Sequence, residues 1–386
     1  MTHSFERQTQ RARNTQFLEG RLVSLDVFRG IAIAFMILLN NLGGDTNYTM
    51  LLHADWNGLT LADIFFPFFL FIVGAAIPYS LGRKLEGNES KKKMLLRIFR
   101  RAIILFALGV FINGFPYFNL STLRVMGVLQ RIALCYLIAS TIYLTLNRRK
   151  QISITVLFMV VYWMLMTLVP VPGYGSGVLE RQGNLAAYVD NLVLGPGHLW
   201  GPLGTWDPEG LLSTIPAIAT TMLGLLAAEH LRTNRTAKNK SMILFLLGAF
   251  LMAIGVLWNL SFPINKNLWT SSFVALTGGM AFVIFGLCYY LIDFKKHVLW
   301  AKPFIIFGLN SIVAYVSTEI VNLTLIYTRV TLGEGTSLSL KGLIYERLFA
   351  SWAGPLNGSI LYGVVFVMLW LGIMTVLYRQ RVFIRI

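Results

Sequence analysis

One short stretch of the chain holds the residue types that proton or acyl transfer requires. It reads His53-Ala54-Asp55-Trp56-Asn57-Gly58-Leu59-Thr60-Leu61-Ala62-Asp63. An imidazole can take up a proton near neutral pH or attack a carbonyl itself, and a nearby carboxylate can orient it. We therefore interpret His53 as a candidate catalytic group, with a purely structural histidine as the alternative. The other histidines lie in the N-terminal tail, in a long loop and at the far ends of apolar runs: His3, His198, His230 and His297.

Further polar residues lie inside or beside long apolar runs. Ionisable groups at membrane depth are costly and usually indicate function. At a helical rise of about 1.5 Å per residue, these groups fall within roughly 10 Å of the same end of their runs. Several spans therefore contribute to one predicted site. Its members are Asn40, Asn41, Asp63, Gln130, Arg131, Asp207, Glu209, Lys266, Asn267, Glu319 and Asn322.

Structural roles are alternatives for several of these residues. Asp63 and Arg131 could form a buried ion pair. The run Asp207-Pro208-Glu209 reads as a helix N-cap followed by proline at the first helical position, and Asn267 could cap the next span. Asp26 and Arg29, three residues apart, could pair on one helix.

The motifs of other enzyme classes do not occur in this sequence. No His or Cys pair has metal-ligand spacing, so we expect no metal site. Neither a nucleophile-elbow, nor a phosphate-binding, nor a dinucleotide-binding fingerprint occurs. The two cysteines, Cys135 and Cys288, exclude a disulfide scaffold.

Apolar runs indicate the elements that position these groups. Hydrophobic residues make up 56% of the 386 residues, and about 20 apolar residues span a membrane as a helix. We predict an all-α polytopic membrane helix bundle of about ten spans, with a tail at 1–21, one transmembrane domain at 22–378 and a tail at 379–386. The predicted spans are Leu22–Leu42, Leu59–Leu81, Arg97–Gly114, Arg124–Leu146, Ile152–Val169, Leu211–Leu231, Ser241–Leu260, Leu268–Ile292, Pro303–Tyr327 and Ile360–Tyr378. Between them, Ser339–Ala353 could form an amphipathic surface helix.

Charge gives the orientation of the bundle. The net charge is +16, and most Lys and Arg fall on one side of the predicted spans, which favours cytoplasmic termini. The charge therefore indicates topology and contact with membrane lipid, and we expect no nucleic-acid partner. The basic inner residues could also attract an anionic ligand. They include Arg83, Lys84, Lys91, Lys92, Lys93, Arg97, Arg100 and Arg101.

Several blocks resemble a known family. Besides the stretch from His53 to Asp63, they include Ser24-Leu25-Asp26-Val27-Phe28-Arg29-Gly30, Asn40, Gly127-Val128-Leu129-Gln130-Arg131, Asp207-Pro208-Glu209-Gly210, Asn265-Lys266-Asn267-Leu268-Trp269 and Gly308-Leu309-Asn310-Ser311. In this order they resemble heparan-α-glucosaminide N-acetyltransferases, and in particular the bacterial transmembrane members.

The resemblance implies an enzyme that moves acetyl from acetyl-CoA to the amine of a glucosamine. His53 then matches the catalytic histidine, and Asn40 belongs to the same site. We expect a bacterial inner-membrane protein with His53 toward the periplasm. The lysosomal enzyme has a large lumenal part ahead of the matching region, so a free or short amino sugar is the expected acceptor here. A homodimer is compatible with the resemblance, and composition leaves the oligomeric state open.

Roles for the remaining residues are hypotheses. Asp63 orients the imidazole or holds the ammonium, and an amide or guanidinium stabilises the oxyanion. We assign substrate binding to Asp55, Trp56, Asn57, Asp207, Glu209, Lys266, Asn267 and Glu319. We assign acetyl-CoA binding to Arg29, Arg124, Gln130, Arg131 and Asn310. The family gives no role for Asp55, because the lysosomal enzyme has a small hydroxyl residue there.

Two reaction routes and two other functions remain open. His53 either acts as a base or first forms an acetyl-imidazole. A transporter of amino sugars also fits a bundle with polar groups inside, and an O-acetyltransferase on an envelope glycan would use the same donor.

Overall fold

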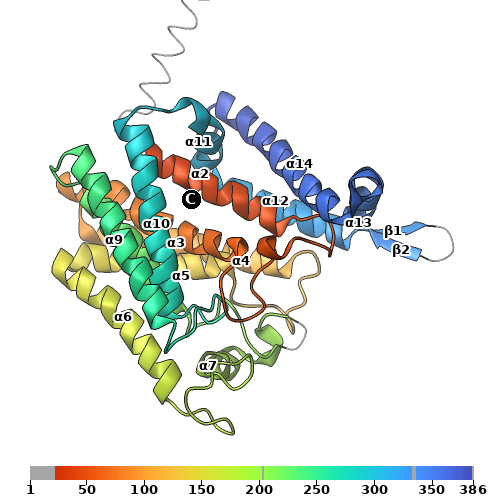
Figure 1. The fold of residues 1–386 in the computed structure, drawn as a ribbon, viewed down its shortest axis with the longest axis horizontal. Helices are drawn as coiled ribbons and strands as arrows, with labels where there is room; N and C mark the ends of the chain where they lie inside the picture. The colour runs from red at the N-terminus through yellow and green to blue at the C-terminus, as the bar shows by residue number, and fades with distance from the viewer. Residues whose placement is uncertain (1–21, 202–203, 333–335, 385–386) are drawn as a thin grey trace, which may run out of the picture.

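The protein is an all-α polytopic helix bundle (Figure 1). The computed structural model describes residues 22–201, 204–332 and 336–384, so the predicted tail at 1–21 lies outside the described residues. Within the described residues, eight helices are long and apolar enough to cross a membrane. They are α2 (Val23–Asn40), α3 (Leu61–Glu86), α5 (Val128–Thr145), α6 (Arg148–Leu168), α8 (Thr214–Leu231), α9 (Ala237–Trp258), α10 with its π-turn (Ser271–Phe294) and α13 with α14 (Leu340–Arg379).

Two of the predicted spans form helices that are not long and apolar enough to cross a membrane by themselves. The predicted span Pro303–Tyr327 is broken at Asn310 into α11 (Lys302–Leu309) and α12 (Ser311–Tyr327), which bend by 71° and count as a ninth span only together. The predicted span Arg97–Gly114 lies within α4 (Lys91–Gly114). Its three arginines, Arg97, Arg100 and Arg101, put more charge into the helix than a lipid-crossing segment usually carries.

Four helices run in the same direction. Phe66 and Phe71 of α3 contact Trp269 at the start of α10 and Phe282 farther along it, so these helices are parallel. The helix α8 is parallel to α3, because Gly74 meets Thr221 at midlength and Gly82 meets Arg232 near the end. The helix α5 is also parallel to α8, because Arg131 near its start contacts Ser213 just before α8, and Tyr143 near its end contacts Arg232 just after α8. Hence α3, α5, α8 and α10 all begin at one end of the bundle.

The first helix runs the opposite way. Phe35 near the end of α2 stacks on Phe65 near the start of α3, with centroids 4.6 Å apart, while Phe28 contacts Phe71 farther along α3. This alternation agrees with the predicted order of spans. Which end faces the cytoplasm stays a prediction.

The core consists of aromatic rings and close backbone contacts. The fully buried side chains include Trp269, Phe28, Phe68, Phe71 and Phe285. Small residues let α3 and α8 approach closely: a Cβ on Gly224 would lie 1.8 Å from the carbonyl oxygen of Phe71. Since the two backbones touch there, α3 and α8 hold a fixed register.

The loops that join the helices contain elements that apolar runs did not reveal. The helix α7 (Leu185–Leu194) lies in the connection after α6, and a hairpin of β1 (Arg329–Leu332) and β2 (Thr336–Ser339) follows α12. The segment Ser339–Ala353, for which a surface helix was predicted, is helical from Leu340 onward: it consists of short α13 (Leu340–Tyr345), a π-turn at Glu346–Ala350 and the start of α14 (Ser351–Arg379). The helix α14 is kinked at Gly354, where φ is 75°.

Candidate active site

The predicted catalytic histidine is paired with a buried carboxylate. His53 follows the short turn η1 (Thr49–Leu51), and its Nδ1 lies 2.8 Å from Oδ1 of Asp63 on α3. An ionised carboxylate only accepts hydrogen bonds, so Nδ1 carries a proton, and in the neutral imidazole Nε2 then keeps a lone pair. The His53 side chain is 52% exposed and that of Asp63 only 1%. The His53 imidazole can therefore reach a solute while the buried Asp63 carboxylate holds it in place.

The start of α3 fixes Asp63. Its Oδ2 accepts hydrogen bonds from the backbone N–H of Thr60 at 3.0 Å, the Thr60 hydroxyl at 2.9 Å and the backbone N–H of Ala54 at 3.1 Å. Asp63 and Thr60 thereby form a capping box at the helix N-terminus. The same carboxylate ties the His53 loop to the helix, so both oxygens contribute to placing the imidazole.

Lys266 lies against the imidazole of His53. Its Nζ is 3.0 Å from Nδ1, 3.2 Å from Nε2 and 3.7 Å from Oδ1 of Asp63. An atom nearly equidistant from both ring nitrogens stands over the ring, because an in-plane position would collide with the carbon between them. Burial lowers the pKa of Lys266, and the carboxylates of Asp63 and Glu209 partly offset this effect.

The turn that carries Lys266 is joined to the His53 loop. The Asn265 amide donates to Oδ1 of Asn57 at 3.1 Å, and Gly58 N–H donates to the Ile264 carbonyl at 2.8 Å. Gly58 has a φ of 110°, which a side chain would strain. The predicted cap at Asn267 is wrong, because α10 begins after Thr270. Asn267 lies in the turn itself, and its substrate role stays a prediction.

Trp56 and Asp55 face different surroundings. Trp56 is buried, its indole N–H donates to the Leu179 carbonyl at 2.9 Å, and its ring meets Trp206 edge-on at 5.2 Å. Asp55 is almost fully exposed and pairs with Arg181. Trp56 therefore supports the loop more than it offers a free sugar platform, although both substrate roles stay predictions.

A second polar group lies at the start of α5 and α8. Arg124 binds Asp207 through two hydrogen bonds of 2.8 and 2.6 Å and Glu209 through one of 2.5 Å. Burial acts to raise the pKa of Glu209, but the charges of Arg124, Arg131 and Lys266 together outweigh it, so that the pKa is lowered. The predicted N-cap at Asp207 is wrong, because α8 begins only after Ser213. Arg124 pairs with both carboxylates. If Asp207 and Glu209 also bind substrate, as predicted, they must contact the substrate and Arg124 at the same time.

Arg131 is fully buried and makes no ion pair with Asp63. Its Nη2 donates to the Gly210 carbonyl at 3.1 Å and to the Ser213 hydroxyl, and its guanidinium lies 5.0 Å from the centre of the Trp269 ring. Asp63 is taken by His53 and Lys266 instead. The expectation of an Asp63–Arg131 pair is therefore wrong, and Arg131 joins α5, α8 and α10.

A third group surrounds Asn40. Its amide donates to Glu319 at 3.2 Å, and Lys341 donates to Asn322 at 3.2 Å on the same helix α12. Tyr315, one turn before Glu319, lies within electrostatic range of Glu319, Glu209 and Arg124. Since Glu209 also acts on Lys266, the three groups influence one another electrostatically, and we call them together the polar zone. Nothing in the sequence distinguished Tyr315 from the other tyrosines.

The other predicted acetyl-CoA ligands lie elsewhere or make internal contacts. Arg29 bonds Asp26 at 3.2 Å, as expected for that spacing, and also the Gly308 carbonyl. Asn310 bonds the backbone of Val382 and Ile384. Arg29 lies eleven positions before Asn40 on α2, or about 16 Å along the helix. The amide of Gln130 donates to the Val125 carbonyl, so donor binding by these three residues stays a prediction.

Asp190 of α7 is a buried carboxylate that sequence reasoning missed. Its Oδ1 accepts a hydrogen bond from Leu211 N–H at 2.8 Å, its Oδ2 has no hydrogen-bond partner, and burial raises its pKa to about 6. It lies on the short helix α7, in a connection where no span was predicted from the sequence, and its contact with the segment before α8 reveals it. Within the described part of the chain, no group of three or more His, Cys, Asp or Glu could hold a metal ion.

Comparison with known proteins identifies the family. The family model "Heparan-alpha-glucosaminide N-acetyltransferase, catalytic" matches residues 21–255. The human heparan-alpha-glucosaminide N-acetyltransferase is 31% identical over 96% of this chain, and the mouse protein of the same name is 33% identical over 78%. The chain belongs to this family.

The family match includes the His53–Asp63 pair and the Arg124 group, and it ends before Lys266. The chain spans 60% of the length of the human heparan-alpha-glucosaminide N-acetyltransferase and 53% of the mouse protein. Membership of the heparan-alpha-glucosaminide N-acetyltransferase family confirms the resemblance that the sequence blocks indicated.

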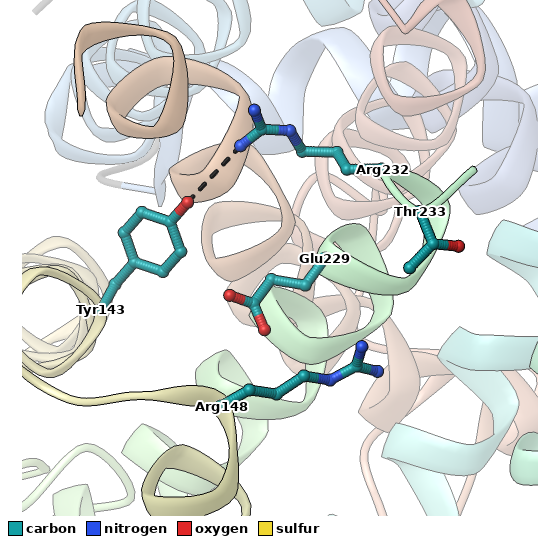
Figure 2. Close-up of a pocket in the computed structure, with 5 residues that line it drawn as sticks. All are labelled: Tyr143, Arg148, Glu229, Arg232 and Thr233. Carbon is teal, nitrogen blue, oxygen red and sulfur yellow. Dashed lines mark hydrogen bonds between the residues drawn. The ribbon is translucent and has the colours of Figure 1, made fainter. Parts of the chain in front are cut away.

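A cavity lies at the other end of the bundle (Figure 2). Its volume is about 230 Å³, and it is lined by the ends of α5 and α8 and the start of α6. Figure 2 shows Arg148 and Arg232 on either side of the Glu229 carboxylate, with Arg232 3.4 Å from the Tyr143 hydroxyl. The helix α8 between this cavity and the polar zone is about 27 Å long.

Proposed function

We propose that the protein is a transmembrane N-acetyltransferase that moves acetyl from acetyl-CoA to the amine of glucosamine, free or at the end of a short glycan. The observation that carries the proposal is the half-exposed His53, whose Nδ1 is bonded to buried Asp63. The relatives named heparan-alpha-glucosaminide N-acetyltransferase support the same chemistry.

The His53 imidazole acts through Nε2. An amino sugar arrives as an ammonium ion and must lose a proton before its nitrogen can attack. That first proton leaves to water. The neutral amine then attacks the thioester carbonyl, Nε2 takes the second proton that the nitrogen gives up as the C–N bond forms, and the imidazolium passes it to the departing CoA thiolate. Asp63 holds the ring in the tautomer that leaves Nε2 free and stabilises the imidazolium. In the alternative route, Nε2 attacks the thioester first and the amine then cleaves the acetyl-imidazole.

The helix ends supply favourable electrostatics for this step. The parallel helices α3, α5, α8 and α10 all begin at the end of the bundle that holds His53. Helix N-termini carry partial positive charge, which stabilises a developing oxyanion. Asn57 lies in the same loop as His53, and its carbonyl oxygen faces Asn265, so its N–H₂ is the end available for an oxyanion.

The donor approaches from the other end in this proposal. The cavity lined by Arg148, Arg232 and Glu229 would receive an anionic phosphate group of the donor, since guanidinium groups bind phosphates well; Arg232 would then share its charge with Glu86. The narrow pantetheine arm would then extend through the bundle toward His53. Cytoplasmic termini and a bacterial inner membrane remain part of the proposal.

An acceptor panel tests this function. Purified protein in lipid nanodiscs is given labelled acetyl-CoA with glucosamine, galactosamine or glucose, and labelled product is counted. We expect transfer to the amino sugars and none to glucose. Transfer to glucose at a similar rate would make the protein an O-acetyltransferase, and uptake of labelled glucosamine into proteoliposomes without acetyl-CoA would make it a transporter.

A further inference from the structure

We propose that Lys266 is itself an acetylation site: when no acceptor is bound, its ε-amine captures the acetyl group that His53 would otherwise deliver to the sugar. This inference rests on the proposed function. It assigns the protein a self-modification that stops its own turnover.

The geometry places an amine where an acceptor amine must stand. Nζ of Lys266 lies 3.2 Å from Nε2 of His53 and 3.0 Å from Nδ1, over the face of the ring. An acyl group on Nε2 is coplanar with the imidazole, and a nucleophile reaches its carbon from above that plane. An acetyl carbon on Nε2 would be bonded directly to that nitrogen, so Nζ, 3.2 Å from Nε2, stands within reach of it on the face from which a nucleophile must approach.

The surroundings keep this amine in place and reactive. The Lys266 side chain is only 13% exposed, and its turn is fixed to the His53 loop through Asn265 and Gly58. Charged groups face it from three elements: Asp63 on α3, Glu209 before α8 and Arg131 on α5. Burial lowers the pKa of Lys266, so the neutral, nucleophilic amine forms at lower pH than for an exposed lysine.

The step balances without any further reactant. The neutral Lys266 amine attacks the acetyl carbonyl, a C–N bond forms, and the bond from that carbon to the CoA sulfur or to Nε2 breaks. The proton lost by Nζ passes through Nε2 to the CoA thiolate. The products are Nε-acetyl-lysine and free CoA. The modified side chain is neutral and longer, so it covers the His53 ring and blocks the acceptor.

Peptide mass spectrometry tests the proposal. The intact protein in nanodiscs is incubated with acetyl-CoA at pH 7, 8 and 9, with and without glucosamine, and turnover is measured on the same preparation. We expect acetyl on Lys266 at least about ten-fold above that on exposed Lys150, since only Lys266 is held against His53. The yield should rise with pH, fall when glucosamine is present, and track the loss of turnover.

A His53→Ala variant separates the proposed route from simple chemical acetylation. In this variant, Lys266 should be acetylated no more than Lys150. Acetylation of Lys266 that is unaffected by His53→Ala overturns the proposal, and so does its absence in the wild-type protein at every pH. If glucosamine is still acetylated in that last case, the proposed function stands while this inference fails; if neither product forms, both fail.

Discussion

Asp63 is the residue on which the site depends most closely. One oxygen accepts from Nδ1 of His53, while the other accepts from the backbone of Ala54 and from Thr60. A carboxylate can do this only while it carries no proton, because all of its partners are donors. An asparagine in this position must turn its N–H₂ toward at least one of these donors.

Asp63→Asn should lower turnover by roughly 10²- to 10⁴-fold. If the amide N–H₂ faces His53, Nδ1 must accept and the proton moves to Nε2, which then cannot act as a base. The rate of N-acetylglucosamine formation measures this effect. The control is Glu89→Gln, which changes one partner of a surface ion pair at the other end of the bundle. Turnover within three-fold of the wild type would show that tautomer control does not matter here.

Asp190→Asn should change how stability depends on pH. The pKa of Asp190 is raised to about 6, so its stabilising contribution is complete below about pH 4 and is lost as pH rises through about 6. The variant should therefore gain up to about 3 kcal/mol relative to the wild type between these limits. Melting temperatures of both proteins in detergent between pH 4.5 and 7.5 measure this, and parallel curves would contradict it.

The sequence predicted that His53 and Asp63 lie together and placed Lys266 in the same site, but it did not place Lys266 against the imidazole. His53 and Asp63 lie in one stretch, so their proximity follows from local chain geometry. Lys266 reaches them from a turn more than two hundred residues away, and only the packing of α10 beside α3 brings it there. The depth of each residue in its predicted span placed Arg131 near Asp63. Depth does not show toward which neighbouring helix a side chain points.

The positions of the helices that carry the site are set by close helix packing rather than by polar contacts. The helices α3 and α8 touch backbone to backbone at Gly74 and Gly224. The helix α3 carries Asp63 at its start, and α8 begins beside the Arg131 contact at Ser213. A shift of either helix would therefore move the polar zone as a whole.

Gly224→Ala should destabilise the protein by roughly 1–3 kcal/mol. The new methyl group would lie 1.8 Å from the Phe71 carbonyl oxygen, a backbone atom that cannot rotate away. Gly372→Ala on α14 is the matched control, since nothing lies within 4 Å of its Cβ position. Melting temperatures in detergent compare the two, and equal values would show that α3 and α8 do not touch as described.

Helix positions were predictable from apolar length, whereas helix ends and breaks were not. The polar run at Asp207 looked like a cap, but Arg124 draws it into the loop and α8 begins at Thr214. The break at Asn310 and the hairpin after α12 depend on tertiary contacts, such as the bonds from Asn310 to Val382 and Ile384.

In the whole molecule, the His53 site and the arginine-lined cavity lie at opposite ends of one bundle. The His53 zone lies where α3, α5, α8 and α10 begin, and the arginine-lined cavity lies where α5 and α8 end. In Figure 1, α7 and the hairpin project from the rest of the bundle. This arrangement suits a donor and an acceptor that meet from opposite sides of a membrane.

Cysteine labelling tests the orientation. The two native cysteines are buried, so Lys150→Cys and Tyr174→Cys, both at exposed positions on either end of α6, provide clean sites. We expect an impermeant maleimide to label Tyr174→Cys in intact cells and Lys150→Cys only after permeabilisation. Labelling of both in intact cells would contradict the topology.

The most direct test of the proposed catalytic role of His53 is turnover by the His53→Ala variant. Purified variant, wild type and His297→Ala, an exposed histidine elsewhere, are each given acetyl-CoA and glucosamine, and their melting temperatures are recorded. We expect His53→Ala to lose at least about 10²-fold in N-acetylglucosamine formation while it melts like the wild type. Near-normal turnover by a folded His53→Ala protein would contradict the account.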